Sequence, residues 1–197
     1  SWPTADGSAN QALITDGSGA LSWSAAATSV NGLSDALVED TGSMYIGNDP
    51  SSTTDGANYN LAVGATALDA ITTGDYNTAI GFSALSANTT GHNNTAGGYD
   101  ALYTNTTGTR NTANGFRALY LNTSGDYNSA FGAIALRNNT TGTRNLAIGY
   151  AAYDGADTES DNLAIGYDAL GGSIAGGEYN VAIGNYTMDA NTEGDYN

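Results

Sequence analysis

From Asn60 onward the chain repeats itself every 17 residues, and this period limits the folds it can adopt. Eight segments begin with Asn and carry Ala two residues later, at Asn60, Asn77, Asn94, Asn111, Asn128, Asn145, Asn162 and Asn180. Only the step from Asn162 to Asn180 differs, at 18 residues. A weaker copy begins at Ser43 in the same phase. Self-similarity at a fixed short period is the signature of a repeat architecture.

Seventeen residues are too few for a pair of helices but suit one turn of a β-solenoid, with two short strands and two bends. The first strand is Asn-x-Ala-Ile, followed by a Gly where a tight turn needs an unhindered backbone. We expect a second strand centred on an Ala-Leu pair, as in Ala84-Leu85. An Asn-Thr-Thr-Gly turn follows, as in 88–91. The prediction is an all-β chain whose residues 43–197 form a parallel β-solenoid, or β-roll, of about nine rungs and roughly 43 Å.

Residues one repeat apart stack in columns along such a solenoid. The second residue after each Asn is always Ala, and the third is mostly apolar, as in Ile80, Phe131 and Ile148. Neighbouring residues of a strand point to opposite faces, so both faces of this strand carry small or apolar side chains. One face can meet the interior, and the other needs a further surface. Since each rung offers too thin a core for a lone rod, we expect the chain to form a homotrimer.

Residues 1–42 lie outside the repeat. Gln11–Thr15 and Ala20–Trp23, joined by an Asp-Gly turn, predict an N-terminal β-hairpin. The stretch 25–40 places Val30, Leu33 and Leu37 at helical spacing and predicts a short helix or collar. Later, 154–161 and 171–177 break the repeat, and we expect irregular loops there, with binding loops as the alternative.

Composition alone would indicate disorder, because Leu, Ile, Val and Phe make up about 15% of the chain. The formal charge of −16 disfavours nucleic acid and anionic lipid as partners. No apolar run is long enough to insert into a membrane, and the start Ser1-Trp2-Pro3 is unlike a signal peptide. Cysteine is absent, which excludes disulfides, thiolate zinc sites and a Cys nucleophile.

The sequence contains neither a Gly-x-Ser-x-Gly nucleophile elbow nor a phosphate-binding loop. The single histidine, His92, lies in a polar turn and is expected to be solvated. Asp75, Asp126 and Asp195 share one column but are separated by other residue types, unlike a regular calcium-binding ladder. The acids of 154–161 are expected to be a solvated charge run rather than a calcium loop. We therefore predict no enzyme activity, no metal and no cofactor.

Three columns are candidates for surface contacts. The residue before each Asn is often Tyr or Arg, and we expect Arg110 to stack on Tyr127 and Arg144 to pair with Asp161. A second aromatic column follows the Gly turn and is expected to lie at a seam, at Phe82, Tyr99, Phe116, Tyr150 and Tyr167. Asn114 stands in the column three residues after each Asn, where other rungs carry Ile. If that column lies on a trimer axis, three copies of Asn114 would form a ring that holds an ion or water and fixes register.

The rungs resemble those of the head domains of YadA-like trimeric autotransporter adhesins, which are trimeric β-rolls with shorter rungs. The longer form at 77–91 more closely resembles repeats in bacteriophage tail-fibre-like proteins, and Trp2 to Ser8 with Gln11 to Trp23 resembles the module that precedes such shafts. The resemblance implies a structural fibre segment of a virion that presents a host-recognition tip and contacts other tail or fibre proteins.

Two alternatives remain. A bacterial surface adhesin would bind a host glycan or protein through exposed Tyr, Asn and loops at the cell surface. An ice-binding solenoid would use the ladder of Thr pairs at 72–73, 89–90, 106–107 and 140–141. Adjacent residues of a strand point to opposite faces, which disfavours a flat Thr surface made from such pairs.

Overall fold

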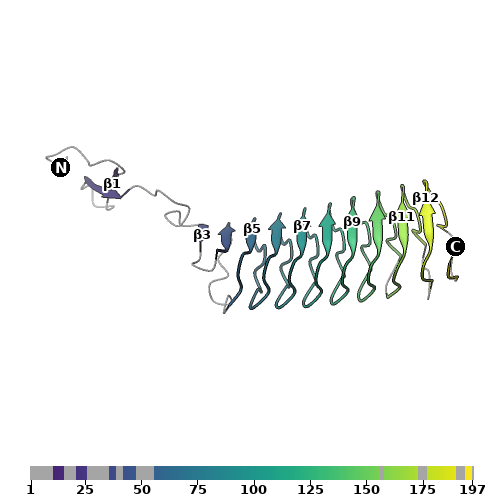
Figure 1. Cartoon of the computed structure of the whole chain (residues 1–197). Coiled ribbons are helices and arrows are strands. Elements are labelled where there is room, and N and C mark those ends of the chain that lie inside the picture. The colour runs from purple at the N-terminus through teal and green to yellow at the C-terminus, as the bar shows by residue number, and fades with distance from the viewer. Residues whose placement is uncertain are drawn as a thin grey trace.

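The computed structural model describes residues 11–15, 21–25, 36–38, 42–47, 56–155, 158–172, 177–189 and 194–196. Across these ranges the chain is all-β, without a helix. Nine parallel strands, β4 to β12, form a β-solenoid, as the repeat predicts. Figure 1 shows their arrows side by side in one row, each joined to the next by a loop that returns beneath the row.

Each strand is three residues long and contains the Ala of the repeat, except β4. The strands are β4 (Met44–Ile46), β5 (Leu61–Val63), β6 (Thr78–Ile80), β7 (Thr95–Gly97), β8 (Thr112–Asn114), β9 (Ser129–Phe131), β10 (Leu146–Ile148), β11 (Leu163–Ile165) and β12 (Val181–Ile183). Equivalent residues pair across every step from β4 to β12, including the 18-residue step between β11 and β12. The extra residue of this step therefore lies in the connection between β11 and β12 and does not change their register.

The N-terminal part holds three further strands. β1 (Gln11–Thr15) and β2 (Leu21–Ala25) pair antiparallel in a sheet of their own. The turn between them lies outside the described residues, so the Asp-Gly hairpin turn stays a prediction. β3 (Ala36–Val38) pairs antiparallel with β4 at the end of the long sheet. The predicted helix over 25–40 is wrong at residues 36–38, because pairing with an open sheet edge outweighs the helical spacing of a few apolar residues. Residues 26–35 lie outside the described part.

The interior of the solenoid is narrow and nearly uniform. The Ala at the centre of each strand from β5 to β12 is buried, which assigns the Ala face to the interior. A second buried Ala and a buried Leu follow in the return segment, at Ala67-Leu68, Ala84-Leu85, Ala101-Leu102, Ala118-Leu119, Ala135-Leu136 and Ala169-Leu170. One turn replaces Leu by Tyr153. Its hydroxyl accepts a hydrogen bond from Asn162 Nδ2 at 2.5 Å, and burial raises its pKa above that of a free tyrosine.

The predicted second strand at the Ala-Leu pair is wrong. These segments form a run of turns in which two residues have positive φ, as at Ser83 (55°) and Leu85 (52°). A strand would send the adjacent Ala and Leu to opposite faces, whereas both are buried. The left-handed backbone lets both side chains face inward. The segment still bonds to the next turn, since Leu85 N–H donates to Ala101 O at 3.0 Å.

The Asn side chain that opens each turn is buried and joins its turn to the next by hydrogen bonds, which the sequence pattern did not predict. Its Oδ1 accepts the backbone N–H of the next Asn in the column, at 2.8 to 3.0 Å from Asn60 through Asn180. Its Nδ2 donates to the carbonyl of the residue three positions before the next Asn, as from Asn111 to Gly125 at 2.7 Å. A second buried ladder links the Asn88, Asn105, Asn122 and Asn139 amides at 2.7 to 2.9 Å. Most of these buried amide groups are thus satisfied by their counterparts one turn away, whereas Asn139 Oδ1, the last acceptor of the second ladder, has no hydrogen-bond partner among the described residues.

The Gly after each strand from β5 to β11 is required by two features of the backbone. At Gly115 φ is +147°, a region that side chains disfavour, and an added Cβ would lie 2.3 Å from Gly132 O of the next turn. Gly132 and Gly149 repeat the pattern. The turns therefore stack at a distance that only an unsubstituted Cα permits.

Candidate functional site: the exposed columns

The outward side of the sheet carries two columns, formed by the first and third residues of β4 to β12; we call it the outer sheet face. Its third-position residues from β5 onward are Val63, Ile80, Gly97, Asn114, Phe131, Ile148, Ile165 and Ile183. In the single chain, Ile80 is 49% exposed, Ile148 39% and Ile183 63%. Single exposed apolar residues are common, but a continuous stripe of them marks a contact surface.

Asn114 lies in the exposed outer column, opposite Gly97 on one side and Phe131 on the other. An added Cβ at Gly97 would meet Asn114 atoms at 3.5 to 3.6 Å, which is ordinary contact. The middle of the outer sheet face is therefore polar and small, because Thr95 and Thr112 occupy the first position of the same strands. The two ends of the face are apolar.

The aromatic column after the Gly turn forms two separate stacks on the surface. Phe82, Tyr99 and Phe116 have ring centroids 5.2 and 5.6 Å apart, and Tyr150 and Tyr167 lie 5.1 Å apart. The rings are about half exposed in the single chain. Each ring therefore covers a face of its neighbour along the solenoid and leaves its edge outward. Whether this column lies at a seam stays a prediction.

The mixed column before each Asn forms the contacts expected from sequence. Arg110 Nη1 donates to Tyr127 Oη at 2.8 Å, with its Cζ 5.2 Å from the ring centroid. Arg144 makes two hydrogen bonds to the Asp161 carboxylate, both at 2.6 Å. These bonds lower the pKa of Asp161 and raise that of Arg144. Tyr59 and Tyr76 stack at 4.9 Å in the same column.

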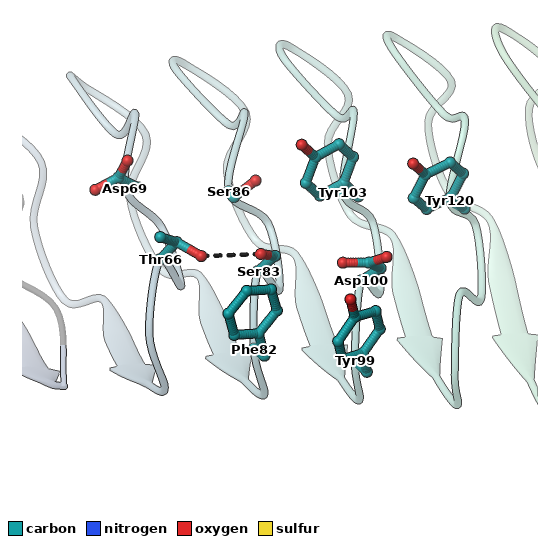
Figure 2. Close-up of a pocket in the computed structure, with 9 residues that line it drawn as sticks. All are labelled: Thr66, Asp69, Phe82, Ser83, Ser86, Tyr99, Asp100, Tyr103 and Tyr120. Carbon is teal, nitrogen blue, oxygen red and sulfur yellow. Dashed lines mark hydrogen bonds between the residues drawn. The ribbon is translucent and has the colours of Figure 1, made fainter.

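A groove crosses the return segments and was not found by sequence reasoning. Its volume is about 430 Å³. It is lined by Thr66, Asp69, Phe82, Ser83, Ser86, Tyr99, Asp100, Tyr103 and Tyr120, which Figure 2 shows on four successive turns. The sequence feature that could have indicated this groove is a third aromatic column, nine residues after the opening Asn. In this column the rings of Tyr103 and Tyr120 stack with centroids 5.3 Å apart.

Arg117 contacts two of the residues that line this groove, Asp100 and Tyr120. Its Nε donates to Asp100 Oδ2 at 3.1 Å, and its Cζ lies 5.1 Å from the Phe116 centroid and 5.2 Å from that of Tyr120. The Asp100 side chain is nearly buried. The pair therefore holds a carboxylate under the groove while the guanidinium covers the outer end of the Tyr103–Tyr120 stack.

The acidic column and His92 support the backbone. Asp75 Oδ1 accepts the N–H of Asn58 at 2.8 Å, and Asp126 Oδ1 accepts that of Thr109 at 2.6 Å. His92 is exposed, and its Nδ1 lies 3.3 Å from Thr90 O. Within the described ranges, no three His, Asp, Glu or Cys side chains gather as metal ligands would. In the irregular 154–161 segment, the described Glu159 takes the Gly position of the turn, its carbonyl accepting from Asn145 Nδ2 at 2.8 Å.

The Thr pairs lie in bends rather than in strands. The first Thr of a pair bonds inside the ladder, as Thr72 Oγ1 does to Thr89 O at 2.9 Å and Thr89 Oγ1 to Thr106 O at 3.1 Å. The second Thr is exposed, as at Thr90 and Thr107. One hydroxyl of each pair is thus committed to joining turns.

None of the described segments forms a helix that is long and apolar enough to cross a bilayer. No protein-family model matches the chain, and neither a curated protein nor a solved structure shows significant similarity to it. The fold and the exposed columns are therefore the basis for the functional argument that follows.

Proposed function

We propose that this chain is a segment of a homotrimeric fibre, a rigid spacer in a bacteriophage tail fibre or related virion appendage that presents a host-recognition tip. The observation that carries this proposal is the outer sheet face, where exposed apolar side chains stand in register along the solenoid on both sides of the polar stretch at Gly97 and Asn114. The protein acts mechanically, without catalysis or a cofactor, and its partners are copies of itself and other tail or fibre proteins.

Burial favours an assembly over a lone rod. Each turn from β5 to β11 buries two Ala and one larger apolar residue, whereas Ile, Phe and Val side chains remain on the outer sheet face. Full burial of a fully exposed side chain of this size contributes about 1.5–3 kcal/mol. Since these side chains are already about half buried in the single chain, each would contribute roughly half of that to an assembly. Three copies related by an axis along the solenoid would bury the same column of each chain, as closed symmetric oligomers do.

Stiffness also fits the role of a spacer. Backbone bonds, two Asn ladders and stacked rings connect each turn to the next, so that bending would strain several ladders together. The chain achieves this without cysteine. A spacer needs this property more than it needs a pocket.

The solution mass from light scattering tests the proposal. We expect the mass of three chains for the natural sequence and dissociation on Ile148→Asp, which places a charge on the outer sheet face. Thr141→Asp adds the same charge at an exposed bend and should keep the trimer. A folded natural chain with the mass of one copy would contradict the proposal.

Within this trimer, Asn114 would meet its two copies on the axis and form the polar ring, with room left by Gly97 on the neighbouring turn. A ring that holds an ion makes the melting temperature depend on that ion. Sodium chloride screens the net charge of −16 in both chains, so the ring is reported by the difference between them. We expect added sodium chloride, compared with an osmotically matched sugar solution, to raise the melting temperature of the natural chain more than that of Asn114→Ile. Equal shifts of the melting temperature in both chains would contradict an ion held by the Asn114 ring.

The Thr geometry favours the fibre over ice binding. A flat ice-binding face needs its hydroxyls in regular rows on a strand, whereas here the pairs lie in bends and one member bonds to the next turn. The absence of thermal hysteresis in a concentrated solution of the chain is the expected result.

A further inference from the structure

The groove lies where a side-chain stack is interrupted. Asp69, Ser86, Tyr103 and Tyr120 occupy the same position on four successive turns. Tyr120 covers one face of the Tyr103 ring, with centroids 5.3 Å apart and planes 9° from parallel. On the other side of Tyr103 the same position is occupied by Ser86, whose side chain is too short to stack on the ring. An aromatic face is thus left open beside a gap.

The gap has the depth of one flat ring. Successive turns lie about 4.8 Å apart, so two turns separate Asp69 from Tyr103 by about 9.6 Å. A ring stacked about 3.5–4 Å from Tyr103 would lie about 5.6–6.1 Å from the level of Asp69. The length of the Asp69 side chain together with one hydrogen bond to a sugar hydroxyl covers that span. The groove volume of about 430 Å³ falls in the range of small-molecule sites, about 300–1,000 Å³.

The walls of the gap differ in character. Phe82 and Tyr99 form an aromatic wall, with ring centroids 5.2 Å apart. Between this wall and the interrupted column lie hydroxyl groups, since Thr66 Oγ1 and Ser83 Oγ are 2.9 Å apart in a hydrogen bond (Figure 2). Ser86 adds another. The site therefore offers a flat apolar platform, several hydroxyls and a carboxylate on the opposite side.

A sugar ring matches this arrangement, because its C–H face is apolar and its hydroxyls project from its edge. Carboxylates accept hydrogen bonds from hydroxyls but repel anions, and the chain carries a net charge of −16. We propose that this groove binds an uncharged sugar residue of a glycan, with Tyr103 as the stacking platform and Asp69 as an acceptor for sugar hydroxyls.

The same residues argue against glycan cleavage. Glycosidases need two carboxyl groups, one of them able to donate a proton. Here Asp100 is bound by Arg117 at 3.1 Å, which holds it as an ion-paired acceptor beneath the groove. The site is one of recognition, and it is independent of the proposed fibre role, since it belongs to the return segments of a single chain.

The test is a binding titration of the whole chain with neutral oligosaccharides of glucose, galactose, mannose and N-acetylglucosamine, followed by ligand-observed NMR. A sialylated oligosaccharide serves as the anionic comparison. We expect at least one neutral series to bind and the sialylated one to bind at least tenfold more weakly. No binding of any neutral series at millimolar concentration would overturn the proposal, as would equal binding of the sialylated sugar.

Two variants locate the site. Ser86→Tyr continues the stack and fills the gap, and Tyr103→Ala removes the platform; each should weaken sugar binding at least tenfold. Tyr150→Ala removes a stacked tyrosine outside the groove and should leave binding unchanged. Retention of binding by Ser86→Tyr would overturn the proposal even if Tyr103→Ala proved unstable. Light scattering on the same samples reports the oligomer separately, so failure of the sugar site and failure of the fibre proposal are distinguishable.

Discussion

The inside and the outside of the solenoid follow different rules. Inside, each position is almost invariant from turn to turn: Asn opens the turn, Ala centres the strand, and Ala-Leu fills the return segment. Outside, the third strand position alone changes from Ile to Gly, Asn and Phe over four consecutive turns, Ile80 to Phe131. The interior repeats because each side chain must fit its own copy one turn away.

This difference separates what builds the fold from what gives it specificity. A change inside disturbs a ladder in which every residue supports the next. A change outside alters a contact surface without removing a bond between turns. The same type of substitution should therefore change the free energy of unfolding far more at an interior position of the solenoid than at an exposed one.

The largest contrast is expected between two glycines. Gly115→Ala places a Cβ 2.3 Å from Gly132 O at a φ of +147°, so the turns must separate. We expect a loss of about 4 kcal/mol or more in the free energy of unfolding. Gly97→Ala meets the nearest Asn114 atom at 3.5 Å and should stay close to the natural stability. Urea titrations followed by circular dichroism measure both, and equal midpoints would contradict the assigned turn spacing.

Two leucines give the next contrast. Leu119 is 0% exposed and Leu121 is 37% exposed. Leu119→Ala leaves a cavity in a core only one side chain wide and should cost about 3 kcal/mol. Leu121→Ala should cost less than about 1 kcal/mol. A comparable loss from both would show that the return segment does not point its Leu column inward.

The Asn ladder is the third test. Asn111 Oδ1 accepts the N–H of Asn128 at 2.9 Å, and its Nδ2 donates to Gly125 O at 2.7 Å. Asn111→Ala leaves the buried N–H of Asn128 without its acceptor, while Gly125 O keeps only the bond from Asn122 Nδ2 at 3.1 Å. We expect a loss of about 2–3 kcal/mol. Asn138, which accepts one bond from the adjacent Arg137 at 3.3 Å, is the matched control. A loss from Asn138→Ala as large as that from Asn111→Ala would refute the role of the ladder.

The smallest effect concerns an outer ion pair. Because Arg144 lowers the pKa of Asp161 in the folded chain, the pair stabilises the fold above the unfolded Asp pKa of about 4. The stabilisation is lost as the pH falls through the lower, folded pKa. The melting temperature of Asp161→Asn should therefore lie slightly below that of the natural chain at pH 7 and converge with it in acid. A constant difference at every pH would contradict this pair as its source.

Much of the fold was predictable because a strict period exposes the columns directly. The 17-residue spacing predicted the parallel solenoid, and the unbroken Ala column predicted a strand with one face against a narrow interior. The Arg144–Asp161 pair followed from the same register. Each of these depends on residues one turn apart, which the period places side by side.

The remaining features depend on backbone conformation. An Ala-Leu pair is compatible with a strand and with left-handed turns alike. The sequence therefore could not predict that the Leu85 side chain points into the interior beside Ala84. Leu37 was misassigned because helical spacing over three apolar residues is weak against pairing with β4. The groove was missed because its walls combine three columns, of which the one holding Tyr103 and Tyr120 is aromatic on only two turns.

The most direct test of the central claim uses the absence of cysteine. A single Cys at Ile148 labels the outer sheet face, and a single Cys at Thr141 labels an exposed bend of the same chain. Under mild oxidation in dilute solution, we predict that Ile148→Cys forms covalent dimers between chains and that Thr141→Cys stays monomeric on a denaturing gel. Cross-linking at Thr141 but not at Ile148 would contradict the account, because the copies would then meet on a different face.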